Sequence, residues 1–208
     1  MTGQFFEENP AVASDPVEFS TRIWGRDLTF STDTGVFARG RLDLGTSVLF
    51  RSTEPPSGGR LLDLGCGYGA IACALAAASG DTAASADTEV VAIDVNNRAL
   101  ALTTANARRN GLTSVRVLRP EQVPDDLTLD QIWSNPPIHA GKGALHELLL
   151  RWLPRLSPDG LAHLVVGRNL GADPLARWLQ DQGYDCARLG SAKGFRVLRV
   201  RPPGVEAA

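Results

Sequence analysis

The stretch RLLDLGCGYGA, residues 60–70, joins an apolar run to a turn that contains three glycines. Gly65, Gly67 and Gly69 follow the spacing G-x-G-x-G, which differs from the G-x-G-x-x-G of dinucleotide-binding proteins. Without a Cβ, glycines let a ligand lie against the backbone. Open α/β sheets bind ligands beyond the carboxyl ends of their strands. The stretch therefore predicts a strand, a ligand-binding turn and a helix.

Strand-like and helix-like segments alternate after this turn. Apolar runs rich in β-branched residues indicate strands, and apolar positions at helical spacing indicate helices. The expected strands are residues 60–65, 89–94, 114–118, 129–134, 161–167 and 195–201. The expected helices are residues 68–79, 97–111, 144–156 and 173–183. This alternation predicts an α/β fold whose mostly parallel sheet is covered by helices on both faces.

The beginning of the chain lacks this regular pattern. Residues 1–20 mix Pro, Glu, Asp and Ser without periodicity, so we expect a loose N-terminal arm. Residues 22–38 contain β-formers broken by Gly and Asp, which favours a β-hairpin. A chain of 208 residues accommodates one large domain, which we place at residues 21–208.

The composition is that of an ordinary globular protein. Hydrophobic residues make up 43% of the chain, charged residues 21%, and the formal net charge is −2. This balance argues against a surface covered in positive charge for nucleic acid. The end of the chain still carries basic side chains that form either a local basic strip or a solvated hairpin: Arg188, Lys193, Arg196, Arg199 and Arg201.

Several sequence features favour a cytoplasmic protein. No apolar run approaches the roughly 18 residues of a membrane span, and the first residues do not follow the pattern of a signal peptide. Cys66, Cys73 and Cys186 lack the paired spacing of metal ligands, so we expect no metal. Their odd number indicates reduced thiols.

An acidic residue, Asp94, ends the second expected strand of the sheet. An acid at this place is the usual partner for ribose hydroxyls. It lies further along than the roughly 20 residues typical of the dinucleotide motif, and the polar residues 80–88 account for the excess. Asp94 and the glycine turn together predict a ligand that contains a nucleoside. An NAD-type domain, or a turn that binds nothing, is the alternative.

These residues resemble a known family. LLDLGCGYG (61–69) followed by VVAIDVN (90–96) resembles motif I and the acidic motif of class I S-adenosylmethionine-dependent methyltransferases. The resemblance implies a Rossmann-like fold with an antiparallel C-terminal strand, and S-adenosylmethionine as the cofactor. The residues that it implies around this cofactor are Asp63, Gly65, Cys66, Gly67, Asp94, Val95 and Asn135.

The expected strand at residues 129–134 stops abruptly at Asn135, Pro136 and Pro137. Two prolines continue neither a helix nor a central strand. If the strand order reverses beside the glycine turn, Asn135 faces the reactive end of the cofactor. Its side-chain carbonyl and the rigid backbone carbonyl of Pro136 would then accept hydrogen bonds from an amine that is to be methylated. A simple turn is the alternative.

The sequence NPP followed by a bulky residue resembles the signature of amino-group N-methyltransferases, which act on adenine, guanine or protein glutamine. Many members carry a stacking aromatic at the position of Ile138. Residues 22–201 as a whole resemble the small-domain branch, the RsmC-like ribosomal RNA guanine-N2 methyltransferases. This resemblance implies that Phe37 lines the cofactor pocket, and that the substrate is held by Ile138, His139 and Lys142.

The expected function is therefore methylation of an exocyclic amine, guanine N2 of ribosomal RNA or of a ribosomal subunit being the first choice. We expect a monomer without a membrane partner. Methylation of a protein glutamine or a small-molecule amine is an alternative, and so is a non-catalytic RNA- or protein-binding module. Glu121 is the candidate for contact with the adenine of the cofactor.

Overall fold

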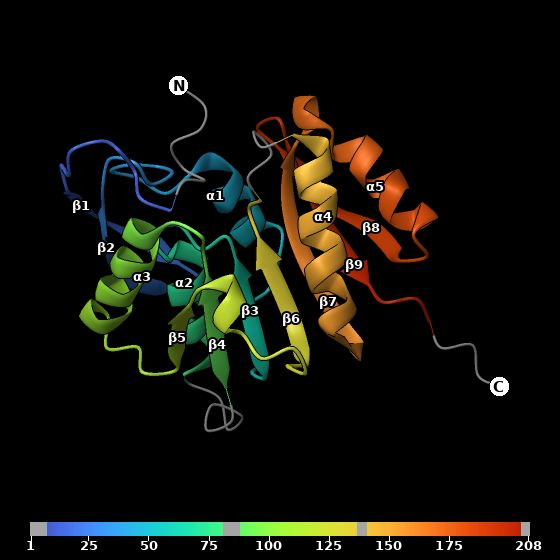
Figure 1. Cartoon of the computed structure of the whole chain (residues 1–208), viewed down its shortest axis with the longest axis horizontal. Helices are drawn as coiled ribbons and strands as arrows, with labels where there is room; N and C mark the ends of the chain where they lie inside the picture. The colour runs from blue at the N-terminus through green and yellow to red at the C-terminus, as the bar shows by residue number, and fades with distance from the viewer. Residues whose placement is uncertain (1–7, 81–87, 137–140, 205–208) are drawn as a thin grey trace.

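The computed structural model describes residues 8–80, 88–136 and 141–204, which form a seven-stranded sheet and a separate two-stranded hairpin (Figure 1). The order across the sheet is β5-β4-β3-β6-β7-β9-β8. Strands β5, β4, β3, β6 and β7 run parallel to one another. The C-terminal strand β9 runs antiparallel to β7, as expected, and also to β8, a strand that the sequence did not predict. The strands are β3 (Arg60–Leu64), β4 (Glu89–Ile93), β5 (Val115–Leu118), β6 (Leu129–Ser134), β7 (Leu156–Gly167), β8 (Asp185–Ala192) and β9 (Phe195–Arg201).

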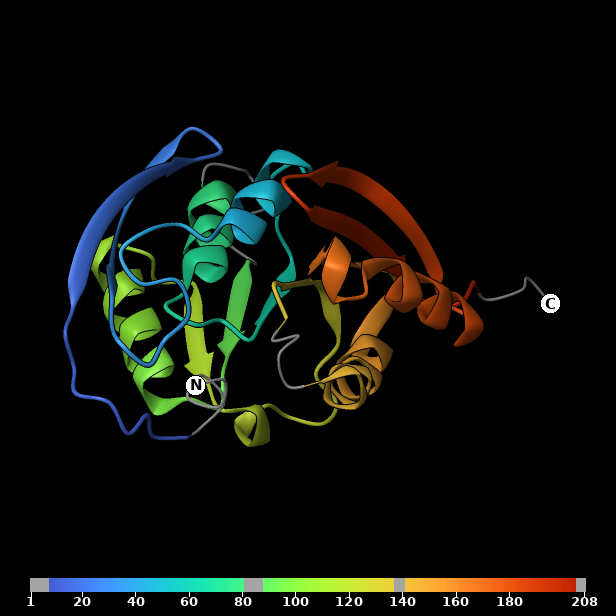
Figure 2. The same ribbon diagram turned by 90° about the horizontal axis from the view of Figure 1, so that it is seen from above.

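Helices cover both faces of the sheet. Figure 2 shows α1 and α2 on the opposite side from α4 and α5. Side chains alternate along a strand, so Leu61 packs into the core under α1 and α2, and Leu62 into the core under α4 and α5. No helix of the described residues is long and apolar enough to cross a membrane. The helices are α1 (Leu44–Arg51), α2 (Ala70–Ser79), α3 (Asn97–Arg109), α4 (Lys142–Trp152) and α5 (Ala172–Asp181), with short 3-10 turns η2 (Pro120–Gln122), η4 (Leu153–Arg155) and η5 (Arg168–Leu170).

A hairpin of β1 (Val17–Ile23) and β2 (Arg26–Thr32) precedes the sheet. Two asparagines one turn apart, one on α3 and one at its C-cap, pair with the open edge of β2. The side-chain amide of Asn106 exchanges hydrogen bonds of 2.7 and 2.9 Å with the backbone of Ser31. Asn110 does the same with Thr29 at 3.0 and 2.8 Å. These amides replace a neighbouring strand and cover an edge that would otherwise be open to pairing.

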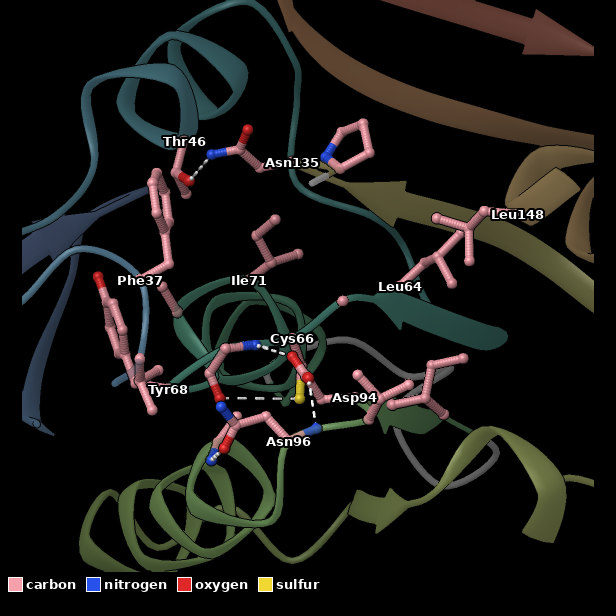
Figure 3. A pocket seen from close by; sticks show the side chains of 18 of the residues that line it. Phe37, Thr46, Leu64, Cys66, Tyr68, Ile71, Asp94, Asn96, Asn135 and Leu148 are labelled. Atoms are coloured by element: carbon pink, nitrogen blue, oxygen red, sulfur yellow. Dashed lines mark hydrogen bonds between the residues drawn. The ribbon is translucent and has the colours of Figure 1, made fainter. Parts of the chain in front are cut away.

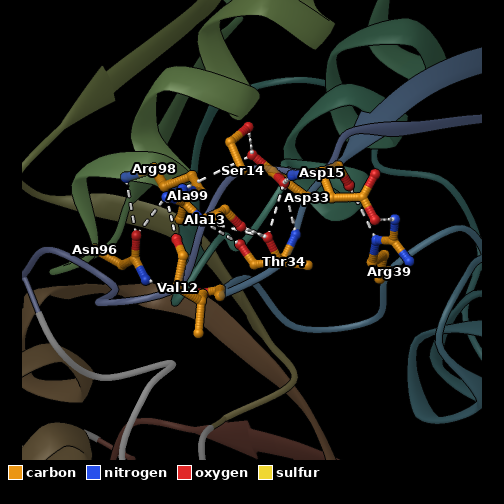
Figure 4. A network of polar contacts seen from close by, with 11 residues as sticks. Val12, Ala13, Ser14, Asp15, Asp33, Thr34, Arg39, Asn96, Arg98 and Ala99 are labelled. Atoms are coloured by element: carbon orange, nitrogen blue, oxygen red, sulfur yellow. Dashed lines mark hydrogen bonds and ion pairs between the residues drawn. The ribbon is translucent and has the colours of Figure 1, made fainter.

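The segment before β1 is held by polar contacts (Figure 4). Asp33, buried at 5% exposure, accepts a hydrogen bond of 2.6 Å from the hydroxyl of Ser14. Arg98 donates to the carbonyls of Val12 at 2.9 Å and Thr34 at 2.7 Å. The boundary that we expected at residue 20 falls inside β1, and the hairpin begins earlier than the sequence indicates. The same network fixes the loop after β2 against the body of the protein.

The strand order changes direction at β3, which has β4 on one side and β6 on the other. Asp63 lies opposite Trp133 in the β3–β6 register. The hydroxyl of Ser134 donates to the carbonyl of Leu64 at 2.6 Å, so the two strands end side by side. The glycine turn and Asn135 follow these two strand ends, at the place where sheets of this kind bind ligands.

Candidate active site

A cavity of about 540 Å³ opens at the carboxyl ends of β3, β4 and β6 (Figure 3). Its walls come from the loop after β2, the glycine turn, the end of β4, η2, α4 and the start of β9. Most of the predicted site residues meet here although they are far apart in sequence. Those that line the cavity are Phe37, Gly65, Cys66, Gly67, Asp94, Val95, Asn135 and Pro136, together with the adenine candidate Glu121.

The remaining predicted site residues either do not line this cavity or are not among the described residues. Asp63 is not among the lining residues, and Lys142 is an exposed residue at the first position of α4. Pro137, Ile138 and His139 lie outside the described residues. The predicted roles of these residues stay predictions.

The glycine turn needs its glycines. The φ angles of Gly65, Gly67 and Gly69 are +78°, +57° and +87°, a region that L residues with a side chain rarely adopt. A Cβ on Gly69 would lie 2.8 Å from Cγ2 of Thr103 and 3.1 Å from its Cα. The Thr103 hydroxyl donates to the carbonyl of Gly67 at 2.9 Å. The turn is therefore locked against α3, and its backbone faces the cavity.

Asp94 connects this turn to the end of β4. Its Oδ2 accepts a hydrogen bond of 2.9 Å from the backbone N–H of Gly67, and its Oδ1 accepts one of 2.9 Å from Asn96. Burial raises the pKa of this carboxyl, while the backbone hydrogen bonds oppose that shift. The backbone N–H of Val95 also acts on this carboxylate. The two oxygens together have four lone pairs, so at least one site remains for a ligand hydroxyl.

Asp63 lies beneath the turn, fully buried. Its Oδ2 accepts a hydrogen bond of 2.8 Å from the backbone N–H of Ala72, whereas its Oδ1 has no partner among the described residues. Burial, and to a lesser extent the charge of Asp94, raises the pKa of Asp63 to about 7. Burial also raises the pKa of the Cys66 thiol, which lines the cavity. Burial therefore favours the neutral thiol of Cys66 and makes Asp63 harder to ionise than an ordinary carboxyl.

Asn135 is held by two residues that sequence reasoning missed. Its Nδ2 donates to the hydroxyl of Thr46 at 3.1 Å (Figure 3). It also donates to Oδ2 of Asp43 at 2.8 Å. Asp43 also caps α1, because the same Oδ2 accepts from the backbone N–H of Thr46 at 3.0 Å. An aspartate before a helix is a recognisable cap signal. A contact between positions 43 and 135 has no such signal.

The cavity walls expose apolar surface. Phe37 is 45% exposed and Val95 41% exposed, although both are large hydrophobic residues on the cavity wall. At the η2 end, Arg151 of α4 donates to the carbonyl of Pro120 at 3.1 Å and closes the wall beside Glu121. The flat apolar part of a ligand would cover the surface of Phe37 and Val95, and a ribose in the same ligand would reach Asp94. S-adenosylmethionine fits these requirements.

The fold, the glycine turn, Asp94 and the strand-ending Asn135 together define a class I methyltransferase. The chain belongs to the methyltransferase small-domain family, because the family model described as "Methyltransferase small domain" matches residues 27–199. The cofactor of this family is S-adenosylmethionine, so the expected enzyme class and cofactor are confirmed.

Individual relatives agree with this assignment. The chain is 31% identical to the uncharacterized protein YbxB of Bacillus subtilis over 205 residues, which are 97% of this chain and 99% of that protein. It is 36% identical to ribosomal RNA small subunit methyltransferase C of Acinetobacter baumannii, over 86% of this chain and 53% of that protein. The chain thus spans about half the length of the ribosomal RNA methyltransferases that it matches.

Solved structures show the same likeness. A Thermus thermophilus 16S rRNA N2 G1207 methyltransferase (RsmC), in complex with AdoMet and guanosine, matches with a TM-score of 0.75 and 26% identity. The match covers 92% of this chain and 52% of that one. TYW2 of M. jannaschii, with a TM-score of 0.58 and 18% identity, shares the fold.

Proposed function

We propose that this chain transfers a methyl group from S-adenosylmethionine to an exocyclic amine, and that guanine N2 of ribosomal RNA is its substrate. It acts in this proposal as a cytoplasmic monomer. The observation that carries the proposal is the setting of Asn135. Both hydrogens of its amide are used by Asp43 and Thr46. Among the described residues, both hydrogen bonds of this side chain start from its nitrogen, so in this proposal its carbonyl oxygen is left to accept one from the substrate.

An exocyclic amine on a base is a weak nucleophile, because its lone pair is shared with the ring. Two carbonyl acceptors make the amine a better nucleophile. They accept hydrogen bonds from its two N–H groups and favour a pyramidal nitrogen, whose lone pair is available. In this proposal the acceptors are Oδ1 of Asn135 and the backbone carbonyl of Pro136, which both belong to residues of the cavity wall. The protein contributes orientation and preorganised dipoles, and it needs no strong base.

When bound, S-adenosylmethionine would supply an electrophilic methyl group and a sulfide leaving group that keeps the C–S electron pair, while the amine would supply its lone pair for the new N–C bond and give up a proton to water. The residues that hold it in this proposal are Asp94 at the ribose, Phe37 and Val95 at the apolar surface, and the turn Gly65–Gly67 at the methionine part, with Asp63 supporting the turn from below.

The preference for ribosomal RNA is supported by the relatives. Ribosomal RNA small subunit methyltransferase C of A. baumannii, and the T. thermophilus enzyme crystallised with guanosine, carry this domain. Two of the five basic residues near the C-terminus are in ion pairs, Arg196 with Asp173 and Arg199 with Asp185. Lys142, Lys193 and Arg188 are exposed and are our candidates for phosphate contacts, with Ile138 and His139 at the base.

Incubation with labelled S-adenosylmethionine tests the substrate. Ribosomal subunits, deproteinised ribosomal RNA and a ribosome-free protein extract are offered separately, and labelled RNA is digested to nucleosides. We expect N2-methylguanosine to carry the label. Label in protein glutamine, with none in RNA, would replace this substrate by the protein alternative.

A further inference from the structure

Asp43 lies directly beside the proposed catalytic asparagine, although no part of the sequence resemblance assigns it a role. We propose that Asp43 is a positioning residue for methyl transfer: it fixes the orientation of the Asn135 amide and strengthens Oδ1 of Asn135 as the acceptor for the substrate amine. This inference rests on the proposed function, because it acts through Asn135.

The first argument is the direction of the hydrogen bond. A side-chain amide has an oxygen end and a nitrogen end of nearly equal size, so packing alone does not select between them. An ionised carboxylate only accepts hydrogen bonds, so the amide must turn its N–H toward Oδ2 of Asp43, at 2.8 Å. The Thr46 hydroxyl, at 3.1 Å, takes the second N–H. The oxygen end is thereby left for the substrate.

The second argument is the rigidity of Asp43. Its Oδ2 caps α1 by accepting from the backbone of Thr46 at 3.0 Å, and its carbonyl accepts from Ser47 at 2.8 Å. A Cβ on Gly45 would lie 2.9 Å from the ring of Phe195 and 3.0 Å from Oδ2 of Asp43. The absence of a side chain at position 45 therefore lets the start of α1 sit this close to β9 and keeps the carboxylate in place.

The third argument concerns charge. Hydrogen bonds to an ionised acceptor are shorter and about twice as strong as neutral ones. In a chain of hydrogen bonds, each bond polarises the next by roughly 10–30%. A carboxylate on the N–H side of the amide withdraws the amide hydrogens toward itself and so increases the negative charge on Oδ1. An acceptor that is stronger in this way holds the substrate amine better.

Two substitutions separate this role from helix capping. Asp43→Ser keeps a good cap, since Ser and Asp cap helices equally well, but its shorter side chain does not reach Asn135. Asp43→Asn keeps the shape of Asp43 and its role as helix cap. It removes the charge, and with it the fixed orientation of the Asn135 amide. Asp159→Ser, an exposed position in β7, is the control.

We expect Asp43→Ser to lower kcat on the order of 100-fold, the cost of a small misplacement of a catalytic group. Asp43→Asn should cause a smaller loss, and the control none. The KM for the amine substrate and the dissociation constant for S-adenosylmethionine should change less than about threefold. In the Asn135→Ala background, Asp43→Ser should cause no further loss, because the two residues act through one interaction. Losses that add in the double variant would overturn the inference.

A second readout does not depend on turnover. In 15N NMR spectra, the side-chain amide of Asn135 should give two resolved, slowly exchanging proton signals shifted downfield by the carboxylate. Asp43→Asn should move them upfield, and the control should not. Unchanged Asn135 signals would reject the role of Asp43. An unaltered rate in Asn135→Ala would reject the proposed function instead.

Discussion

Replacement of Gly69 by alanine is expected to damage the glycine turn in a way that the structure quantifies. At φ +87° a residue with a side chain costs about 1–2 kcal/mol. The new Cβ would also lie 2.8 Å from Cγ2 of Thr103, which is fully buried and hydrogen-bonded. Overpacking of this kind costs about 1–3 kcal/mol. We therefore expect Gly69→Ala to lower the free energy of unfolding by about 2–5 kcal/mol.

Gly111→Ala is the matched control. Gly111 has a φ of +69°, and a Cβ there would meet nothing within 4 Å. This variant should lose only the backbone contribution, about 1–2 kcal/mol. The change in unfolded-chain entropy is the same for both substitutions and cancels. Urea unfolding measures the free energy of unfolding of both variants. Calorimetric titration should show weaker S-adenosylmethionine binding for Gly69→Ala alone. Equal destabilisation of the two variants would refute the packing argument.

Three further predictions concern other parts of the site. Asp94→Asn should weaken S-adenosylmethionine binding about 10- to 100-fold in calorimetry, the worth of a hydrogen bond to a charged group; unchanged affinity would remove Asp94 from the ribose site. The pKa of Asp63 is raised to about 7, so the folded state binds this proton more tightly than the unfolded state. The resulting stability is fully present below about pH 4 and is lost as the pH rises through 7. The unfolding free energy of the wild type relative to Asp63→Asn should thus fall between about pH 4 and pH 7 and level off above that, and a constant difference would contradict the raised pKa. Asn106→Ala should cost about 2–4 kcal/mol, because it leaves the buried carbonyl of Tyr68 and the part-buried backbone groups of Ser31 without this partner; hydrogen exchange at the Ser31 amide should accelerate, and unaltered protection would show that the hairpin does not depend on Asn106.

For residues that directly follow strand ends, the sequence was enough to predict that they meet at one edge of the sheet. Parallel strands bring their carboxyl ends to one edge, so the positions of Gly65, Asp94 and Asn135 followed from the order of the elements. Asp63 stands in the same motif, but side chains alternate along β3, and its carboxylate points under α2. Its predicted contact with the cofactor stays a prediction.

Contacts between distant segments could not be predicted in this way. Asp43 reaches Asn135 only because α1 packs on the sheet beside β7 and β9. Asn106 and Asn110 read as weak helix formers in the sequence, and their pairing with β2 depends on how the hairpin docks. Each of these contacts is set by tertiary packing, which local periodicity does not encode.

The proposed role of Asn135 is tested most directly by single-turnover methyl transfer with Asn135→Ala. The variant and the wild type are saturated with labelled S-adenosylmethionine and mixed with ribosomal RNA from cells that lack this protein. We predict that the variant binds the cofactor normally and transfers methyl groups to guanine N2 on the order of 100-fold more slowly or worse, since it loses one preorganised acceptor. Transfer by the variant at the wild-type rate would contradict the account.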